Sequence, residues 1–288
     1  MEKVLKKLNL LLIAGSLFWF VGCENPEQKE PITPQKAIAA LTEFAQVSNQ
    51  FSATVKESGS RVDGTGLNVT SNILSAIVYP QVSCTLLGDD TWKVVCNYGP
   101  TLIQCDDGYL RRGIVNIVTN GFFIAPGTVM TLTFDNFYQK GDWLQQEYKI
   151  DGTQVIKNEG INAKNSNMID YSVTVTNGLI TYNTKEIHYS ETTTRTLLPS
   201  STLCENNWYI TGEWSGVSSD KVSYTLKASQ TPLHYKVCCH FFQDGILNVD
   251  VEGLSPFSID YGYAEGEEDC DRKAELNYPG LKSIFFDM

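Results

Sequence analysis

The sequence predicts a mainly β protein: an antiparallel meander forming a sandwich, a barrel-like sheet or one long curved sheet, with one N-terminal helix. From about Ile73 onward, short runs of alternating apolar and polar residues are separated by Gly, Asn and Asp. No helical segment interrupts these runs, which favours direct pairing of consecutive strands. Strict alternation over 130–134 and 171–175 gives each of these strands one apolar and one polar face.

The predicted helix begins after a polar stretch. Thr33 and Pro34 are residue types preferred at the N-cap and the first helical position. Apolar residues recur at helical spacing over 34–48, which predicts a helix of about three to four turns. Residues 51–72 lose that period and contain three glycines, so we expect a loop there.

The predicted strands follow one another at intervals of about 8 to 14 residues. They span residues 128–138, 143–150, 171–176, 179–183, 187–196, 209–213, 222–227 and 235–242. Asn177-Gly178 lies between two of these runs and is the dipeptide most suited to a type I′ hairpin turn. Further turns are expected at Asn120-Gly121, Lys140-Gly141 and Asp244-Gly245.

The first residues have the pattern of a bacterial lipoprotein signal. Three early lysines precede an apolar run over 10–21, which ends at Gly22-Cys23. Cleavage before Cys23 would leave a thiol that takes a diacylglycerol, and acyl groups such as palmitate would complete the anchor. The run is shorter than the roughly 18 to 20 residues that span a membrane. Phe20-Val21-Gly22 is a poor small-x-small cleavage site, which makes plain secretion the weaker alternative.

We expect four parts: a signal peptide over 1–22, a flexible tether over 23–33, a helix and loop over 34–72, and an antiparallel β domain over 73–288. The tether is polar and contains proline, as extended linkers do. No Asp follows Cys23, so an inner-membrane retention signal is missing and the outer membrane is expected. The periplasmic face and the cell surface both stay open.

The charge of the chain limits its partners. Removing residues 1–22 changes the formal charge from -11 to -13, because Glu2 and three lysines are lost. This balance argues against nucleic acid and against electrostatic adhesion to anionic headgroups. The N-terminal lipid is therefore the expected contact with the membrane. No nucleophile elbow, zinc-protease motif or phosphate loop is present, and nothing in the sequence demands a cofactor.

Seven cysteines remain once Cys23 is lipidated. They are Cys84, Cys96, Cys105, Cys204, Cys238, Cys239 and Cys270. Export allows disulfides to persist, and an odd number leaves at least one thiol free or paired between chains. The connectivity does not follow from the sequence. Cys238-Cys239-His240 invites a metal or redox interpretation, but adjacent residues of a strand face opposite sides of the sheet.

Short motifs from about residue 80 onward carry a resemblance to a known group. They are Asn97-Tyr98-Gly99, Asp107-Gly108 with Gly113, residues 131–134 with Asn136-Phe137-Tyr138, and Ile259-Asp260-Tyr261-Gly262 with Cys270-Asp271. In these motifs the chain resembles β-rich lipoproteins widespread in the phylum Bacteroidota. The resemblance implies an exported, all-β, lipid-anchored domain, and it transfers no catalytic or ligand residue. The closing loop is lengthened here by residues 265–269.

An acidic loop is the best local candidate for a cation site. Its carboxylates belong to Asp260, Glu265, Glu267, Glu268, Asp269 and Asp271. Calcium takes about six to eight oxygen ligands. The spacing matches no EF-hand, and a solvated acidic loop needs no metal, so both interpretations stay open.

A second kind of site would use paired carboxylates for glycoside hydrolysis. The available acids are Asp106, Asp107 and Asp135, and the residues that could stack on sugar rings are Trp92, Trp143, Trp208 and Trp214. Asp106-Asp107-Gly108 also fits a turn, and tryptophans in β proteins mostly belong to the core.

We therefore expect a lipid-anchored cell-envelope lipoprotein with a non-enzymatic β domain. That domain would serve as a scaffold or bind a glycan or an envelope protein through aromatics such as those of 136–138 and 208–209. The alternatives are a surface carbohydrate-active enzyme or glycan-binding protein, and a fimbrial-type structural subunit that exchanges strands between chains.

Overall fold

The structure is a computed structural model that describes most of the chain after residue 31. The described residues are 32–65, 80–141, 146–202, 205–237, 239, 242–262, 273–280 and 284–287. Their elements belong to one compact unit that runs from Ile32 to Met288. The signal peptide over 1–22, Cys23, nearly all of the tether and the acidic residues 265–271 lie outside the described residues.

One antiparallel sheet contains all the strands, and each strand pairs with the next one along the chain. The strands are β1 (Gln81–Gly88), β2 (Thr91–Gln104), β3 (Tyr109–Thr119), β4 (Val129–Gly141), β5 (Tyr148–Ile161), β6 (Ile169–Tyr182), β7 (Lys185–Leu198), β8 (Asn207–Val217), β9 (Ser223–Lys236), β10 (Ile246–Val251), β11 (Phe257–Asp260), β12 (Lys273–Asn277) and β13 (Ile284–Asp287). The predicted antiparallel meander is confirmed. β1 and β13 are its edges, so the sheet is open.

The alternation read from the sequence has its expected structural consequence. In β4, Met130 and Leu132 are buried, whereas Thr131 between them is not. In β6, Tyr171, Val173 and Val175 are buried and alternate with residues that are not. The predicted turns at Asn120-Gly121 and Asp244-Gly245 lie between consecutive strands. One face of the sheet therefore holds the apolar core.

The hairpin predicted at Asn177-Gly178 is wrong, because both residues lie inside β6. Asn177 has a φ of 51°, and the pairing with β7 shifts register between Val175 and Gly178. A β-bulge uses the same residue types as a tight turn. A Cβ on Gly178 would approach the Tyr189 carbonyl oxygen to 2.5 Å, so the bulge needs glycine there. The chain reverses further on, after Tyr182.

The single described helix is twice as long as the sequence predicted. Helix α2 spans Pro34–Gly64, with Thr33 as N-cap and proline in the first turn, as expected. Its second half contradicts the loop expected over 51–72. Phe51, Val55 and Val62 continue the buried helical stripe into that region. Gly59 lies inside the helix, and the Phe123 ring packs so closely against it that a Cβ would come within 2.7 Å of the ring.

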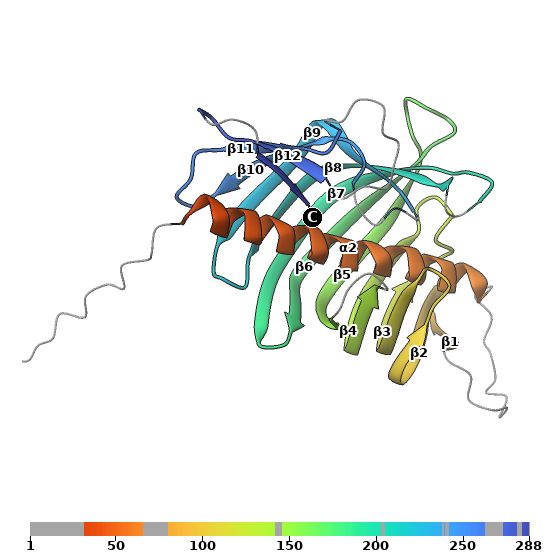
Figure 1. Cartoon of the computed structure of the whole chain (residues 1–288). Helices are drawn as coiled ribbons and strands as arrows, with labels where there is room; N and C mark the ends of the chain where they lie inside the picture. The colour runs from red at the N-terminus through yellow and green to blue at the C-terminus, as the bar shows by residue number, and fades with distance from the viewer. Residues whose placement is uncertain are drawn as a thin grey trace, which may run out of the picture. The chain divides into compact units, whose positions relative to one another are not determined.

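Helix α2 runs across the strands on the core side of the sheet (Figure 1). At its start, Glu43 accepts a hydrogen bond from the Tyr182 hydroxyl of β6, at 2.7 Å. At its end, the Asp63 carboxylate accepts one from the backbone N–H of Phe123, in the β3–β4 loop, at 2.7 Å. Because Tyr182 and Phe123 lie at opposite ends of the strands, the helix crosses the inner face of the sheet diagonally.

Candidate functional site

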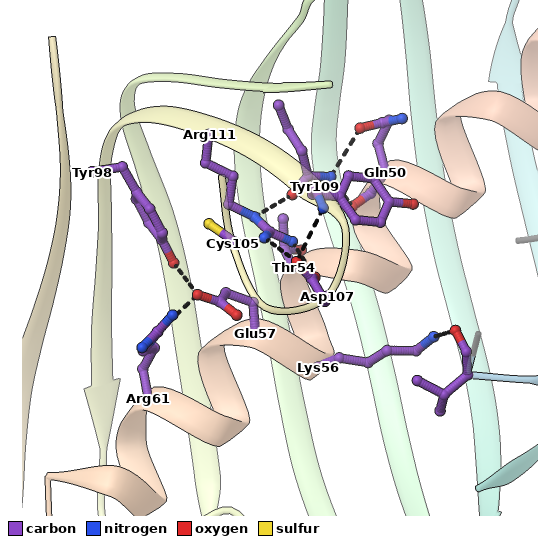
Figure 2. Close-up of polar contacts among 12 residues, drawn as sticks. Gln50, Thr54, Lys56, Glu57, Arg61, Tyr98, Cys105, Asp107, Tyr109 and Arg111 are labelled. Atoms are coloured by element: carbon purple, nitrogen blue, oxygen red, sulfur yellow. Dashed lines mark hydrogen bonds and ion pairs between the residues drawn. The ribbon is translucent and has the colours of Figure 1, made fainter. Parts of the chain in front are cut away.

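A cluster of charged and amide side chains lies between α2 and the strands β2 to β5 (Figure 2). At its centre, the fully buried Arg111 of β3 donates two hydrogen bonds of 2.6 Å to the Asp107 carboxylate. Asp107 is held by the turn before β3, where it also accepts the backbone N–H of Tyr109. Burial by itself lowers the pKa of Arg111, but the hydrogen bonds and charge of Asp107, followed by the charge of Glu57, outweigh it and raise the pKa. Arg111 also donates a hydrogen bond of 2.8 Å to the Gln139 side-chain oxygen. Arg111 is a permanent interior cation.

Amide side chains link this centre to the helix. The Gln139 amide of β4 donates to the Gln50 side-chain and backbone oxygens, at 2.8 and 3.1 Å. One strand further, Thr54 donates to the Gln154 side-chain oxygen at 2.7 Å, and Gln154 donates to the Phe51 carbonyl at 3.1 Å. Hydrogen bonds between buried amides restrict how two elements can pack against each other. These contacts fix the position of α2 on the sheet.

Glu57 joins the cluster from the next turn of the helix. It accepts hydrogen bonds from Arg61 at 2.7 Å and from the Tyr98 hydroxyl of β2 at 3.0 Å, as Figure 2 shows. Burial raises the pKa of Tyr98 well above its ordinary value, and the Glu57 charge raises it further. The Tyr98 hydroxyl therefore stays protonated and remains a donor at any physiological pH.

A second buried ion pair lies on β7. Arg195 donates to Glu191 at 2.7 Å, and their side chains are 1% and 0% exposed. Tyr189 donates to the same carboxylate at 2.9 Å, and Arg195 also reaches the Ser52 hydroxyl of α2 at 3.0 Å. Each arginine is therefore paired with a carboxylate close to it in sequence: Asp107 for Arg111 and Glu191 for Arg195. Each also has a second hydrogen-bond partner, which is Gln139 for Arg111 and Ser52 of α2 for Arg195.

Lys56 differs from these arginines because no carboxylate pairs with it among the described residues. Its amine lies 3.5 Å from the Val237 carbonyl oxygen and 4.5 Å from the centre of the Tyr235 ring. A small cavity of about 30 Å³ adjoins it. Burial, followed by the positive charge of Arg195, lowers the pKa of Lys56 to about 7, while Asp107 opposes that change.

Three of the described cysteines are free thiols, namely Cys84, Cys96 and Cys105, whereas Cys239 is disulfide-bonded. All three free thiols are buried. Burial raises the pKa of Cys96 to about 12, and the nearby Glu57 adds to the increase. Because the thiolate is the reactive form, these thiols are chemically inert in the folded protein.

We expect the three thiols to react with a thiol reagent such as Ellman's reagent only when the protein unfolds. Native protein should release little colour from them, and guanidinium chloride should expose all three. Replacing Cys84, Cys96 or Cys105 with serine should in each case lower the number of thiols that react in the unfolded protein by one. Full reaction of these cysteines in native buffer would contradict their burial.

Glu43 makes folding sensitive to acid. Burial by itself raises the pKa of Glu43, but hydrogen bonds from Ser219 and Tyr182 and the charge of Lys185 outweigh it, so the net pKa is lowered. The unfolded chain therefore binds a proton more readily than the folded one. The stabilisation is complete above the ordinary pKa of 4.5 and is lost as the pH falls through the lower folded-state value.

We accordingly expect the free energy of unfolding to fall as the pH drops below the ordinary pKa of 4.5, and Glu43→Gln to flatten part of that decline. Urea unfolding at several pH values measures this. Glu186→Gln, at an exposed position of β7, is the matched control and should leave the slope unchanged. An equal slope for wild type and Glu43→Gln would show that Glu43 does not contribute.

The carboxylates considered for hydrolysis have separate environments. Asp106 and Asp107 form the turn before β3, as the alternative interpretation stated, and Asp107 is held by Arg111. Asp135 is exposed in β4, where it accepts a hydrogen bond from Asn136. No contact joins Asp135 to the other two among the described residues. The structure therefore does not bring these acids together as a catalytic pair.

Most of the aromatic residues considered for ligand stacking belong to the core. Trp208, Trp214 and Phe137 are 4%, 1% and 1% exposed, so none of them presents a ring to solvent. Trp92 and Tyr138 are half-buried, and Arg112 covers the Tyr138 ring at 3.4 Å. Tyr209 is also half-buried and stacks on His234, with ring centres 4.8 Å apart.

The remaining predicted site residues are only partly covered by the structure. Asp260 ends β11 and accepts the backbone N–H of Gly262 at 3.0 Å. The other acids of the loop lie outside the described residues, as do Cys23, Trp143, Cys204, Cys238, His240 and Cys270. Within the part of the chain that the structure describes, no group of three or more His, Cys, Asp or Glu side chains is placed to hold a metal ion.

Sequence reasoning missed the charged interior on both α2 and β7. In β7 the buried face carries Tyr189, Glu191, Thr193 and Arg195, and the outer face is also polar. A strand with two polar faces gives no alternation from which to choose the inner one. Glu191 and Arg195, four residues apart, were the only available signal for an ion pair on one face.

These observations define an open antiparallel meander sheet whose inner face is filled by one helix. No protein-family model, curated protein or solved structure matches this chain. Among the described residues, no helix combines the length and the apolar character needed to cross a bilayer.

Proposed function

We propose that this chain is a lipid-anchored lipoprotein of the cell envelope, tied to the membrane through Cys23, with a β domain that acts as a non-enzymatic scaffold or binding domain. The basic start, the short apolar run and Gly22-Cys23 support the anchor. The acidic balance of the mature chain leaves the lipid as its means of membrane attachment.

The observation that carries the non-enzymatic proposal is the occupation of the inner face by α2. A concave face is where a ligand or substrate would be enclosed, and here helix residues from Glu43 to Asp63 bond to the strands instead. The Asp107 and Glu191 carboxylates, which are 16% and 0% exposed, are engaged by Arg111 and Arg195. The outer face and the loops are therefore the surfaces left for a glycan or a protein partner.

On the outer face, Tyr209 and His234 form the best candidate contact surface for a glycan or an envelope protein. Their rings are stacked at 12°, and a His234 ring nitrogen is 2.8 Å from the Asn207 side-chain oxygen. A partly exposed aromatic pair beside an amide offers both a flat apolar surface and hydrogen bonds. The preceding residue, Trp208, is buried on the core side of the same strand.

No specific contact favours the two alternatives. A hydrolase would need two carboxylates across a cleft, and the described candidates are separate. A strand-exchanging fimbrial subunit would leave a terminal strand without a partner, whereas β1 pairs with β2 and β13 pairs with β12.

Metabolic labelling tests the anchor. Wild-type protein made in a bacterial host with an alkyne analogue of palmitate should carry the label and sediment with membranes. Cys23→Ser should lose the label and leave the membrane fraction, while the matched variant Cys84→Ser keeps both. Label retained by Cys23→Ser, or unlabelled wild-type protein, would refute the anchor.

An array of bacterial envelope glycans tests the contact surface. We expect the wild-type protein to retain a subset of glycans and Tyr209→Ala to lose them. Tyr138→Ala, which removes a ring already covered by Arg112, is the control and should bind normally. Equal binding by wild type and Tyr209→Ala would remove this surface from the proposal.

A further inference from the structure

The Lys56 amine lies beside the polar cluster, and none of the described carboxylates forms an ion pair with it. Three guanidinium groups in or beside the interior form ion pairs with carboxylates: Arg111 with Asp107, Arg195 with Glu191, and Arg61 with Glu57. A protonated Lys56 would be a fourth cation with no carboxylate of its own. A buried charge without a partner is strongly disfavoured, so the neutral amine fits this environment.

The cavity beside the amine gives it room to react. Its volume of about 30 Å³ exceeds the roughly 10–15 Å³ that one water-sized probe needs. The groups that face Lys56 are Ser52 and Asn49 of α2, Asp107 and Tyr109 at the β2–β3 turn, Tyr235 of β9, and Cys239. Arg195 of β7 acts on the amine through its charge. Lys56 as a residue is half-buried, so the cavity is within reach of a small solute.

We propose that Lys56 is a covalent capture site for short-chain aldehydes, which it binds as a neutral imine. Lysines that are desolvated, or that lie near another cation, are the ones that form Schiff bases with carbonyl compounds. Lys56 meets both conditions, through its burial and through Arg195. A pKa of about 7 leaves much of its amine unprotonated at neutral pH.

The reaction balances without an oxidant or a reductant. The amine lone pair attacks the carbonyl carbon, so a C–N bond forms while the C=O π bond breaks. A proton moves from nitrogen to oxygen and gives a carbinolamine. Loss of the hydroxyl with the remaining amine proton, as one water, leaves the C=N bond.

The charge of the product favours an aldehyde over other small reactants. An imine is neutral, so its formation leaves the three ion pairs around Lys56 as they are. A carbamate formed from carbon dioxide, or a bound carboxylate, would add a negative charge beside Asp107, which lines the same cavity. Two negative charges that line one small cavity repel each other.

Reductive trapping with formaldehyde tests this site. Full-length protein is treated at pH 7 with limiting formaldehyde and cyanoborohydride, which converts an imine into a stable methylamine, and peptides are analysed by mass spectrometry. We expect Lys56 to be methylated at least about tenfold faster than the exposed Lys93 and Lys157, because ordinary lysines are almost entirely protonated at this pH. Slower labelling of Lys56 than of these lysines would overturn the proposal.

Two further measurements keep the test independent of any one variant. In wild-type protein, the labelling rate of Lys56 should level off above about pH 7, while that of Lys93 keeps rising towards pH 10. A Lys56 rate that also rises to pH 10 would contradict the proposal. Ala53→Leu narrows the cavity but keeps the amine, and should slow the labelling of Lys56 without changing that of Lys93. An unchanged labelling rate of Lys56 in a folded Ala53→Leu protein would show that the aldehyde does not reach Lys56 through this cavity.

Discussion

Replacing Arg195 with methionine is expected to lower the free energy of unfolding by about 3–5 kcal/mol, because it leaves the Glu191 carboxylate unpaired in the interior. Both side chains are almost completely buried, at 1% and 0% exposed. The Ser52 hydroxyl of α2 also loses its guanidinium donor. Urea or guanidinium unfolding of the purified domain measures the change.

Two comparisons separate the loss of the ion pair from the loss of packing. The double variant Glu191→Leu, Arg195→Met removes both charges and should recover much of the stability, since apolar replacement of a buried pair is often neutral or favourable. Lys227→Ala breaks an ion pair whose side chains are 54% and 58% exposed, and should cost about 0–1 kcal/mol. Equal effects of Arg195→Met and Lys227→Ala would contradict the buried pair.

Phe51→Ala is expected to destabilise the domain by about 3–5 kcal/mol, the range for truncating a buried phenylalanine. The ring is 0% exposed and stacks on Tyr189, with centres 5.1 Å apart and planes at 7°. It also meets Phe134 edge-on at 6.2 Å. The side chain thus joins α2 to β4 and β7 at once, and its removal leaves a cavity between them.

The matched control for this change is Phe122→Ala. Phe122 lies in the β3–β4 loop and is 37% exposed, so its truncation should change stability by well under half as much. Thermal unfolding of the three proteins compares them directly. A stable Phe51→Ala protein would show that residues 51–64 do not pack on the sheet and would restore the loop first expected there.

The strands were predictable because period-2 alternation arises wherever one face of a sheet is buried and the other is solvated. Met130 and Leu132 in β4 and Val173 and Val175 in β6 show this relation directly. The start of the helix was predictable for a comparable local reason. The Thr33 side chain accepts the Lys36 backbone N–H, at 3.3 Å, and needs no distant partner.

The errors arose where a local signal had two structural meanings. Asn177-Gly178 is compatible with a tight turn and with a bulge, and the neighbouring backbone of β7 decides between them. The second half of α2 contains three serines, one threonine and two glycines, which favour turns and loops when no partner is present. Thr54 is compatible with a buried helix only because Gln154 of β5 meets it there.

The candidate site was almost wholly unpredictable from the sequence. Glu57, Tyr98, Arg111 and Gln139 come from four segments, and no spacing between them reveals that they meet. Lys56 is ordinary as a residue type, and its altered pKa arises from burial and from Arg195, which is distant in sequence. Reactivity at such a residue is a property of its surroundings.

By itself the sequence determined the fold class, the consecutive order of the strands and the start of the helix, because these depend on alternation, turn residues and capping within a few positions. The tertiary structure alone decided how far α2 extends, which face of β7 is buried, and which charges are paired. Those outcomes depend on desolvation and on partners about a hundred residues away, as with Thr54 and Gln154. A buried polar side chain is stable only when its partner is in place, and only the folded chain supplies that partner.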